Sequence, residues 1–268
     1  MSLWDRSGFT LIELLVVISI VALLAAIMFP VYRNVTLKGK MVREVQAGRN
    51  LITGYLAAAA DRDGQLLGGY DRSVTEVGLP DGTSHGSPVS NRYPYRVLPY
   101  VGNKVEGTLL INDSIKSIAP SNTYMVSCYP AFGINYIFVG GDIMSNGSLK
   151  NQAECITRQG AGEVSPLVFA SAAGDADDGK IPGYCLLTPP QTTGAMWTTA
   201  RWTTKSYAAE YGNIDPRYSK KAVCVFLDGS VQQLGVEELR DMRLWSRNAA
   251  LANNPNYTIA PSAPTGGR

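Results

Sequence analysis

Residues able to do chemistry are few in this 268-residue chain, and they lie far apart in the sequence. The single histidine, His85, lies in the Gly-, Ser- and Pro-rich stretch DGTSHGSPVS, which offers a general base no rigid setting. The sequence contains no Gly-x-Ser-x-Gly elbow, no nucleotide-binding glycine loop and no paired metal-ligand histidines. We therefore expect His85 to be a solvated loop residue and the protein not to be an enzyme.

An acidic stretch, GDADDGK, is a second candidate site. It places Asp175, Asp177 and Asp178 in a glycine-flanked loop, where carboxylate oxygens suit Ca²⁺. Their spacing departs from the EF-hand pattern, so a solvated acidic turn is the preferred interpretation. No cofactor is predicted, and Ca²⁺ binding is the alternative.

The four cysteines are Cys128, Cys155, Cys185 and Cys224. None forms a CxxC pair, and with a single histidine they do not indicate a zinc site. In an exported domain they could form one or two disulfides, with three full pairings that the sequence does not rank. Buried free thiols are the alternative.

A glutamate lies inside the most apolar stretch of the chain, RSGFTLIELLVVISIVALLAAIMFP. From Phe9 to Phe29 only Thr10, Glu13 and Ser19 are polar. Twenty-one helical residues rise about 31 Å, the thickness of the hydrocarbon core of a bilayer. An acidic residue costs about 2.5–3.5 kcal/mol near the centre of a membrane helix. The stretch predicts a membrane helix, and Glu13 is a candidate functional residue.

Three kinds of N-terminal segment could contain such a stretch. A secretory signal has a shorter apolar region followed by an A-x-A cleavage site, which is missing here. A plain signal anchor explains the length but neither Glu13 nor the sharp Ser7-Gly8-Phe9 boundary. The third kind is cut before the apolar residues, which remain in the mature protein, and it is preferred.

Gly8-Phe9-Thr10-Leu11-Ile12-Glu13, followed by an unbroken apolar helix, resembles the class III signal of type IV prepilins and type II secretion pseudopilins. In that family glycine precedes the cut and glutamate is the fifth mature residue, as Gly8 and Glu13 would be here. The resemblance implies that a membrane-embedded prepilin peptidase removes residues 1–8 and that Phe9 is N-methylated. It also implies a filament built around the apolar helix. Pro30 lies where many pilin helices are kinked, because proline removes a backbone donor.

Glu13 then acquires a specific expected role. The new amino group of Phe9 is charged at the membrane, and a carboxylate of a neighbouring subunit could pair with it. Such pairing would fix the register of assembly; the alternative is that Glu13 snorkels to the headgroups. The expected processing and methylation residues are Gly8, Phe9 and Glu13, and the expected assembly residues are Phe9, Glu13 and Pro30.

Charge bears on partners and location. The net charge is +2, and no basic cluster interleaves with aromatic residues, so no nucleic-acid partner is expected. Basic residues after the apolar stretch favour a cytoplasmic head by the positive-inside rule: Arg33, Lys38, Lys40, Arg43 and Arg49. The cleavage motif and the cysteines favour export and are given more weight. We predict a single pass of the bacterial inner membrane, with the head in the periplasm or extracellular in a filament.

The rest of the sequence predicts an α+β, pilin-like fold in which one long helix packs on a small, mainly antiparallel β head. Apolar residues at helical spacing continue to about Ala60, interrupted by Gly39, Gly48 and Gly54, which either weaken the helix or permit close packing. The expected parts are a leader (1–8), a transmembrane helix (9–30), an amphipathic spine (31–60), a head (61–248) and a mobile tail (249–268).

Within the head, strands are expected at residues 93–101, 123–127, 135–139, 167–171 and 222–234. A short closing helix is expected from Val236, Leu239, Met242 and Trp245.

The stretch VCVFLDGSVQQL predicts a hairpin with a two-residue turn at Asp228-Gly229. It also resembles the C-terminal signature of the prepilin-type H-X9-DG proteins, a pseudopilin subgroup, as do FGINYIFVGG and VSPLVFAS. Tyr218 stands at the histidine position of that signature, which leaves any role of the histidine unassigned. Major pseudopilins similar to this chain often hold calcium in a head loop, which concerns the acidic stretch.

The predicted function is that of a structural subunit of a type II secretion pseudopilus or type IV pilus-like filament. Its expected partners are the prepilin peptidase, other pilin or pseudopilin subunits and the inner membrane. The alternative is a single-pass membrane-anchored domain that binds a ligand or acts as an enzyme. An anchor of that kind would need neither Gly8 nor Glu13.

Overall fold

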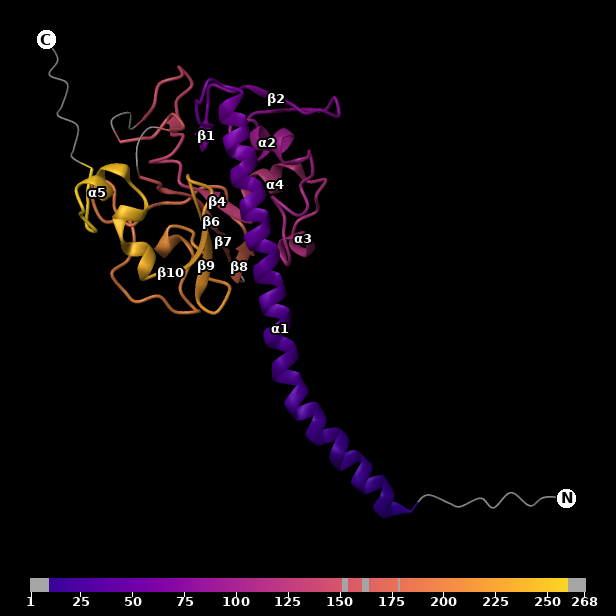
Figure 1. Ribbon diagram of the computed structural model, residues 1–268. Coiled ribbons are helices and arrows are strands. Elements are labelled where there is room, and N and C mark those ends of the chain that lie inside the picture. The colour runs from indigo at the N-terminus through magenta and orange to yellow at the C-terminus, as the bar shows by residue number, and fades with distance from the viewer. Residues whose placement is uncertain (1–9, 151–153, 161–163, 178, 260–268) are drawn as a thin grey trace, which may run out of the picture. The chain divides into compact units, whose positions relative to one another are not determined.

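The computed structural model describes residues 10–150, 154–160, 164–177 and 179–259 (Figure 1). The chain divides into two units, one ending at Met41 and one beginning at Val42. Helix α1, Leu11–Ala60, contributes to both units, and its end at Ala60 confirms the expected boundary. The helix stops at the sequence DRDG, where Asp63 and Gly64 adopt positive φ values of 53° and 81°.

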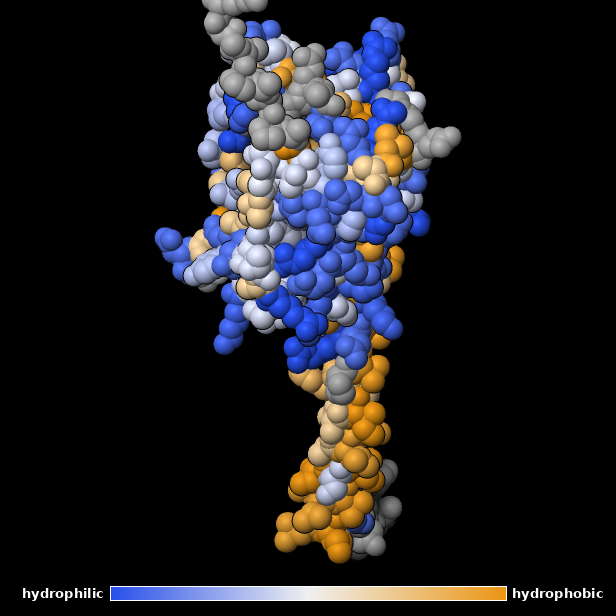
Figure 2. All heavy atoms as spheres, turned by 90° about the vertical axis from the view of Figure 1, so that its left-hand side faces the viewer, coloured by the Kyte–Doolittle hydropathy of each residue, from blue (hydrophilic) through white to orange (hydrophobic). Residues whose placement is uncertain are grey.

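From Leu11 to Phe29, within the first unit, α1 exposes apolar side chains around almost its whole circumference. The large hydrophobic side chains from Leu11 to Phe29 are all about half exposed or more. Figure 2 shows this segment as a nearly continuous hydrophobic surface, in contrast to the mostly hydrophilic face of the second unit. By length and composition α1 can cross a membrane. A helix that is hydrophobic on all sides belongs in lipid or in a protein interior, because water offers it no favourable face.

In the second unit, the C-terminal part of α1 is amphipathic and packs on the head. Its buried face includes Ala47, Leu51, Tyr55 and Ala58, which recur at helical spacing. Gly48 permits a close approach, because a Cβ atom there would lie 2.8 Å from Cγ2 of Val225. Close packing is thus the role of this helical glycine.

A four-stranded antiparallel sheet with the order β10-β9-β6-β4 forms the centre of the head. Its strands are β4 (Phe132–Ile134), β6 (Leu167–Ser171), β9 (Lys221–Phe226) and β10 (Val231–Gly235). One face packs on α1, where the rings of Tyr55 and Phe169 meet edge to face at 5.3 Å. The other face packs on the C-terminal turns through Cys224, Met242 and Trp245. Figure 1 shows the sheet between these two layers.

Three two-stranded sheets lie at the periphery of the head. Strand β1 (Tyr70–Asp71) pairs in parallel with β5 (Asp142–Ile143). The other two pairs are antiparallel: β2 (Glu76–Gly78) with β3 (Ser84–Gly86), and β7 (Ala173–Ala176) with β8 (Gly179–Pro182). The architecture is α+β with a long N-terminal helix and mainly antiparallel sheets, which confirms the expected pilin-like fold class.

Short helices complete the described head. They are α2 (Tyr93–Val97), η1 (Leu98–Val101), α3 (Ser114–Ser117), α4 (Thr123–Cys128), η2 (Ala209–Tyr211), η3 (Glu238–Arg240), η4 (Met242–Leu244) and α5 (Arg247–Leu251).

Two expected strands are therefore helices. Residues 93–101 form α2 and η1, each with a proline in its first turn, where a missing N–H costs no bond. Residues 123–127 belong to α4, which Asn122 caps by accepting a hydrogen bond from the Met125 N–H. Residues 135–139 form a turn after β4. Short aromatic and apolar stretches fit a buried helix as well as a strand, and here the first-turn prolines and the Asn122 cap favour the helix.

The C-terminal segment also differs from expectation. The apolar residues of the expected closing helix, Val236, Leu239, Met242 and Trp245, are all buried. They lie on the 3₁₀ turns η3 and η4 and their flanks, because Asp241 interrupts the helix and caps η4 instead. Helix α5 crosses the expected start of the tail at residue 249, and Tyr257 and Ile259 pack against the core. Residues 260–268 lie outside the described residues.

Candidate functional site: two carboxylates on one helix

Glu13 forms a capping box at the start of α1. The Glu13 Oε2 atom accepts hydrogen bonds from the backbone N–H and the hydroxyl of Thr10, both at 2.8 Å. The Thr10 hydroxyl in turn accepts from the Glu13 N–H at 3.3 Å. These reciprocal bonds satisfy backbone donors that the first turn of a helix leaves open. Within the described residues, Glu13 thus has a local structural role that the sequence analysis missed, although Thr10-x-x-Glu13 is the known signature of such a box.

The other expected N-terminal site residues are only partly visible. Gly8 and Phe9 lie outside the described residues, so no geometry accompanies their expected roles in cleavage and methylation. Helix α1 continues through Pro30 without a break in its helical assignment.

The best-enclosed charged group in the described head is Glu44, on the buried face of α1. Its side chain is fully buried and lies on the same face of the helix as Ala47 and Leu51. The Ser171 hydroxyl of β6 donates to Oε1, and the Tyr218 hydroxyl donates to Oε2, each at 2.5 Å. The Arg217 guanidinium lies 3.7 Å from Oε2. We call Glu44, Ser171, Arg217 and Tyr218 the Glu44 cluster.

Arg217 links this cluster to the surrounding backbone. Its Nε lies 3.0 Å from an oxygen of Asp215, and its Nη2 donates to the Ala172 carbonyl. Burial alone would lower the pKa of Arg217, but the carboxylates of Glu44 and Asp215 outweigh it and raise that pKa. The guanidinium therefore stays charged, and it balances the buried carboxylate of Glu44.

Tyr218, at the position of the signature histidine, thus has a defined place in the structure. Burial and the adjacent Glu44 carboxylate raise the pKa of the Tyr218 phenol, so the hydroxyl keeps its proton and donates it. Asn112 donates a further bond to the Tyr218 hydroxyl at 3.0 Å. Tyr218 stands out in the sequence and its partner Glu44 does not, although an acidic residue on the apolar face of an amphipathic helix is a usable signal.

The Asp228-Gly229 turn has the structural role that was expected, with a different loop. The expected hairpin is present, with Val231 opposite Val225. Its loop is longer than two residues, because Ser230 accepts from the Phe226 N–H and Gly229 donates to the Phe226 carbonyl. Gly229 has a φ of +85°. This is a tight turn followed by one left-handed glycine, so a single position needs positive φ. Asp228 accepts from the Ser230 N–H, which stiffens the loop.

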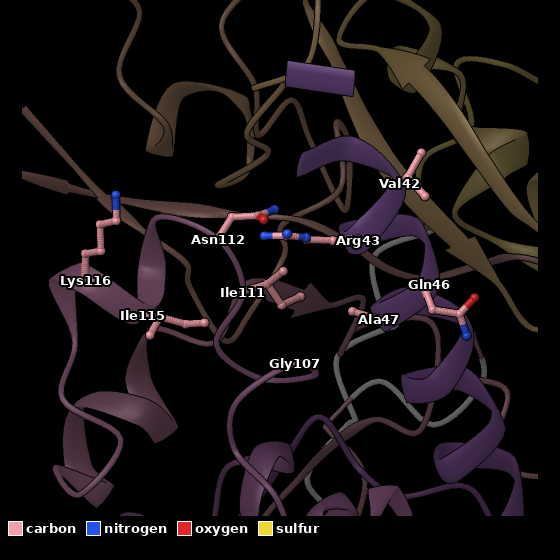
Figure 3. A pocket seen from close by; sticks show the side chains of 9 residues that line it. All are labelled: Val42, Arg43, Gln46, Ala47, Gly107, Ile111, Asn112, Ile115 and Lys116. Carbon is pink, nitrogen blue, oxygen red and sulfur yellow. The ribbon is translucent and has the colours of Figure 1, made fainter. Parts of the chain in front are cut away.

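A groove of about 620 Å³ runs beside the Glu44 cluster (Figure 3). Its lining residues are Val42, Arg43, Gln46, Ala47, Gly107, Ile111, Asn112, Ile115 and Lys116. In Figure 3 the guanidinium of Arg43 reaches toward Asn112, the residue that also contacts Tyr218. The groove has an apolar floor with basic and amide groups at its rim, a composition that suits a protein segment or an amphipathic ligand.

Among the remaining candidate residues, Asp175 and His85 make structural contacts. Both oxygens of Asp175 accept backbone N–H groups, from Ala208 at 2.7 Å and from Ala209 at 2.8 Å. The described residues contain no cluster of three potential metal ligands, and Asp178 lies outside them.

His85 is not a solvated loop residue: it is half-buried on β3, and the centroid of its ring lies 4.8 Å from that of Tyr95. The four cysteines are free thiols.

Comparison with known proteins bears on the N-terminal segment. The family model for the prokaryotic N-terminal methylation motif matches residues 5–29. No curated protein and no solved structure matches the chain. The motif implies processing by a prepilin peptidase and assembly of the pilin kind in general, and the apolar part of α1 is compatible with a single-pass membrane anchor. The N-terminal segment thus carries the prokaryotic N-terminal methylation motif, which supports the type IV prepilin and pseudopilin class.

Proposed function

We propose that the protein is a structural subunit of a type II secretion pseudopilus or type IV pilus-like filament. The observation that carries the proposal is the methylation motif at residues 5–29 at the start of an exposed apolar helix. In this proposal the peptidase cuts after Gly8, Phe9 is N-methylated, and subunits polymerise through α1. An apolar helix that leaves the bilayer needs a new apolar environment, and the helices of other subunits provide one.

Glu13 can serve assembly as well as the helix start. A carboxylate has four lone-pair sites, and within the described residues the capping box uses one oxygen, Oε2. The N-terminal ammonium of a neighbouring subunit could pair with the other oxygen while the cap stays intact. In surroundings of low dielectric constant this pair would be strong, so it would favour one axial offset between subunits.

The head acts in this proposal as a non-enzymatic body presented by the filament. The roles found for Asp175 and His85 in the described head are structural, which supports a binding or building role over a catalytic one. The proposed location is the bacterial inner membrane, with the head in the periplasm or extracellular after assembly. Its proposed partners are the prepilin peptidase and other pilin or pseudopilin subunits.

The groove of Figure 3 favours one alternative function, a single-pass anchored domain that binds a ligand. The two functions differ in what the N-terminus must do. A filament subunit must be cut before Phe9, whereas an anchored receptor works with residues 1–8 in place.

Intact-mass analysis of the protein from a host with a prepilin peptidase separates these functions. We expect a chain that begins at Phe9 and carries one added methyl group. Gly8→Leu should block the cut and leave the protein in the membrane, because the apolar residues are unchanged. A wild-type chain that retains residues 1–8 in such a host would refute the filament proposal.

A further inference from the structure

Two cysteines that are 57 positions apart in the sequence lie next to each other in the head. The N–H of Cys185 donates to the carbonyl of Cys128 at 2.9 Å. Standard bond lengths across such a hydrogen bond place the two Cα atoms about 5–6 Å apart. Disulfides join Cα atoms about 4.4–6.8 Å apart, so this backbone spacing is compatible with a disulfide.

The surrounding backbone holds both cysteines in this register. Cys128 is the last residue of α4, and Cys185 follows β8. Tyr184 donates to the Pro130 carbonyl at 3.0 Å, and Cys185 accepts from the Ile134 N–H at 3.0 Å. The hydrogen bonds on either side of the pair thus come from the same two segments, which restrains the cysteines toward one relative placement.

The side chains also share one environment. Burial raises the pKa of the Cys185 thiol to about 12, a nearby Arg92 opposes this, and a charge on Cys128 would raise it further. The backbone hydrogen bond and this mutual influence together place the two thiols in one region of the head. The ring centroids of Tyr129 and Tyr184 are 6.2 Å apart. Burial raises the pKa of both phenols, and charges on Cys128 and Cys185 would raise it further. Cys128 is the more accessible of the two, whereas Cys185 is buried.

The other two cysteines occupy separate sites. The Cys155 thiol lies against the carbonyl of Ile156, and the Cys224 thiol lies against the carbonyl of Ala222 in β9. Cys224 packs into the core on the C-terminal face of the sheet. Neither has a backbone hydrogen bond to another cysteine among the described residues.

We propose that Cys128 and Cys185 form a disulfide when the head meets a disulfide oxidant, either a protein disulfide or a small-molecule one. The Cys128 thiolate attacks one sulfur of the oxidant, whose S–S bond breaks and releases one thiolate. Cys185 then loses its proton to solvent and attacks the Cys128 sulfur, which releases the second thiolate. Two protein thiols are oxidised to one disulfide, and one oxidant disulfide is reduced to two thiols.

The crosslink would close a loop that contains β4 to β8, and so would tie the segment after β8 to α4. A loop of about 57 residues restricts the unfolded chain considerably, so oxidation should raise the melting temperature by roughly 10 °C. The inference concerns thiol chemistry of the head in vitro. It therefore stands or falls independently of the filament proposal.

The test uses the full chain in detergent, incubated with oxidised glutathione, alkylated and digested for peptide mass mapping. We expect a peptide that joins Cys128 to Cys185, with Cys155 and Cys224 recovered alkylated. Dithiothreitol should reverse both the linkage and the rise in melting temperature. Mapping of the wild-type chain needs no variant to fold.

Matched variants sharpen the result. Cys128→Ser and Cys185→Ser should each abolish the crosslink and the thermal shift, whereas Cys155→Ser and Cys224→Ser should retain both. A linkage through Cys155 or Cys224 would overturn the proposal. So would a glutathione adduct on Cys128 that never closes, or four thiols that stay reduced.

Discussion

The two parts of helix α1 each carry a glutamate on an apolar surface, and the two glutamates are treated differently. Glu13 is exposed, and within the described residues its bonds come from Thr10, one turn away. Glu44 is fully buried and accepts bonds from side chains more than a hundred positions away. A buried carboxylate is tolerable when donors and a counter-charge enclose it. The head supplies these for Glu44, whereas among the described residues the Glu13 carboxylate has only Thr10 as a donor.

The largest predicted effect follows from removing Glu44. Glu44→Leu would leave Arg217 with Asp215 as its remaining carboxylate partner and the Ser171 and Tyr218 hydroxyls without their acceptor, which should cost about 3–5 kcal/mol in free energy of unfolding. Urea denaturation of the full chain in detergent, followed by tryptophan fluorescence, measures this loss. Glu44→Gln should lose less, because the amide oxygen still accepts a hydrogen bond. Equal stability of Glu44→Leu and wild type would show that the cluster contributes no net stabilisation.

Glycines on the two parts of α1 give a second contrast. At Gly48 an added Cβ would lie 2.8 Å from Cγ2 of Val225, so Gly48→Ala should destabilise the head by about 1–3 kcal/mol. At Gly39 a Cβ would meet nothing within 4 Å among the described residues. Gly39→Ala should therefore add helical stability of up to about 1 kcal/mol. Circular dichroism during thermal unfolding compares the two, and the same sign for both would contradict the packing argument.

Tyr218 offers a smaller change within the Glu44 cluster. Tyr218→Phe removes a hydrogen bond to a charged group and should cost about 1.5–3 kcal/mol. In the wild type, folding raises the pKa of the Tyr218 phenol. The contribution of this phenol to the free energy of unfolding is therefore fully present below about pH 10 and is lost as pH rises further. Above pH 10, wild-type stability should therefore fall by up to about 1.4 kcal/mol per pH unit more steeply than that of Tyr218→Phe. Parallel alkaline slopes would show that the phenol is not held neutral.

The smallest effect on folding is expected at Glu13. Glu13→Val breaks the capping box and removes a charge from the apolar stretch, and among the described residues the hydrogen bonds of this carboxylate stay within the first unit. The urea midpoint of the head should stay unchanged, and membrane insertion should be unharmed or slightly better. Cleavage should continue because Gly8 is intact. Crosslinking between cysteines introduced into the α1 helices of neighbouring subunits should fall, because assembly is weakened. Crosslinked ladders like those of wild type would show that Glu13 serves only its own helix.

The expectations about the fold that hold rest on local sequence patterns. The length of α1, strand β6 at Leu167–Ser171 and the hairpin around Asp228-Gly229 follow from local periodicity and turn chemistry, which a sequence displays directly. The strands expected at residues 93–101 and 123–127 are helices, because first-turn prolines favour α2 and η1 and the Asn122 cap favours α4.

The candidate sites divide in the same way. Glu13 is recognisable because its motif is contiguous in the sequence. The Glu44 cluster joins residues from α1, β6 and the segment before β9, and only the folded chain brings them together. Pairing of Cys128 with Cys185 likewise depends on two segments meeting at one backbone hydrogen bond. Spacing along the chain could rank none of the three pairings.

The Glu44 cluster also determines how the head would carry a mechanical load. Sliding α1 by one residue would turn its side chains by about 100° and would swing the Glu44 carboxylate away from Ser171 and Tyr218. A pull along the helix is therefore resisted first by these short bonds and then by the backbone carbonyls that hold Arg217. Force would reach the strands as shear across several hydrogen bonds together. The cluster would thus resist sliding of α1 along the sheet of the head.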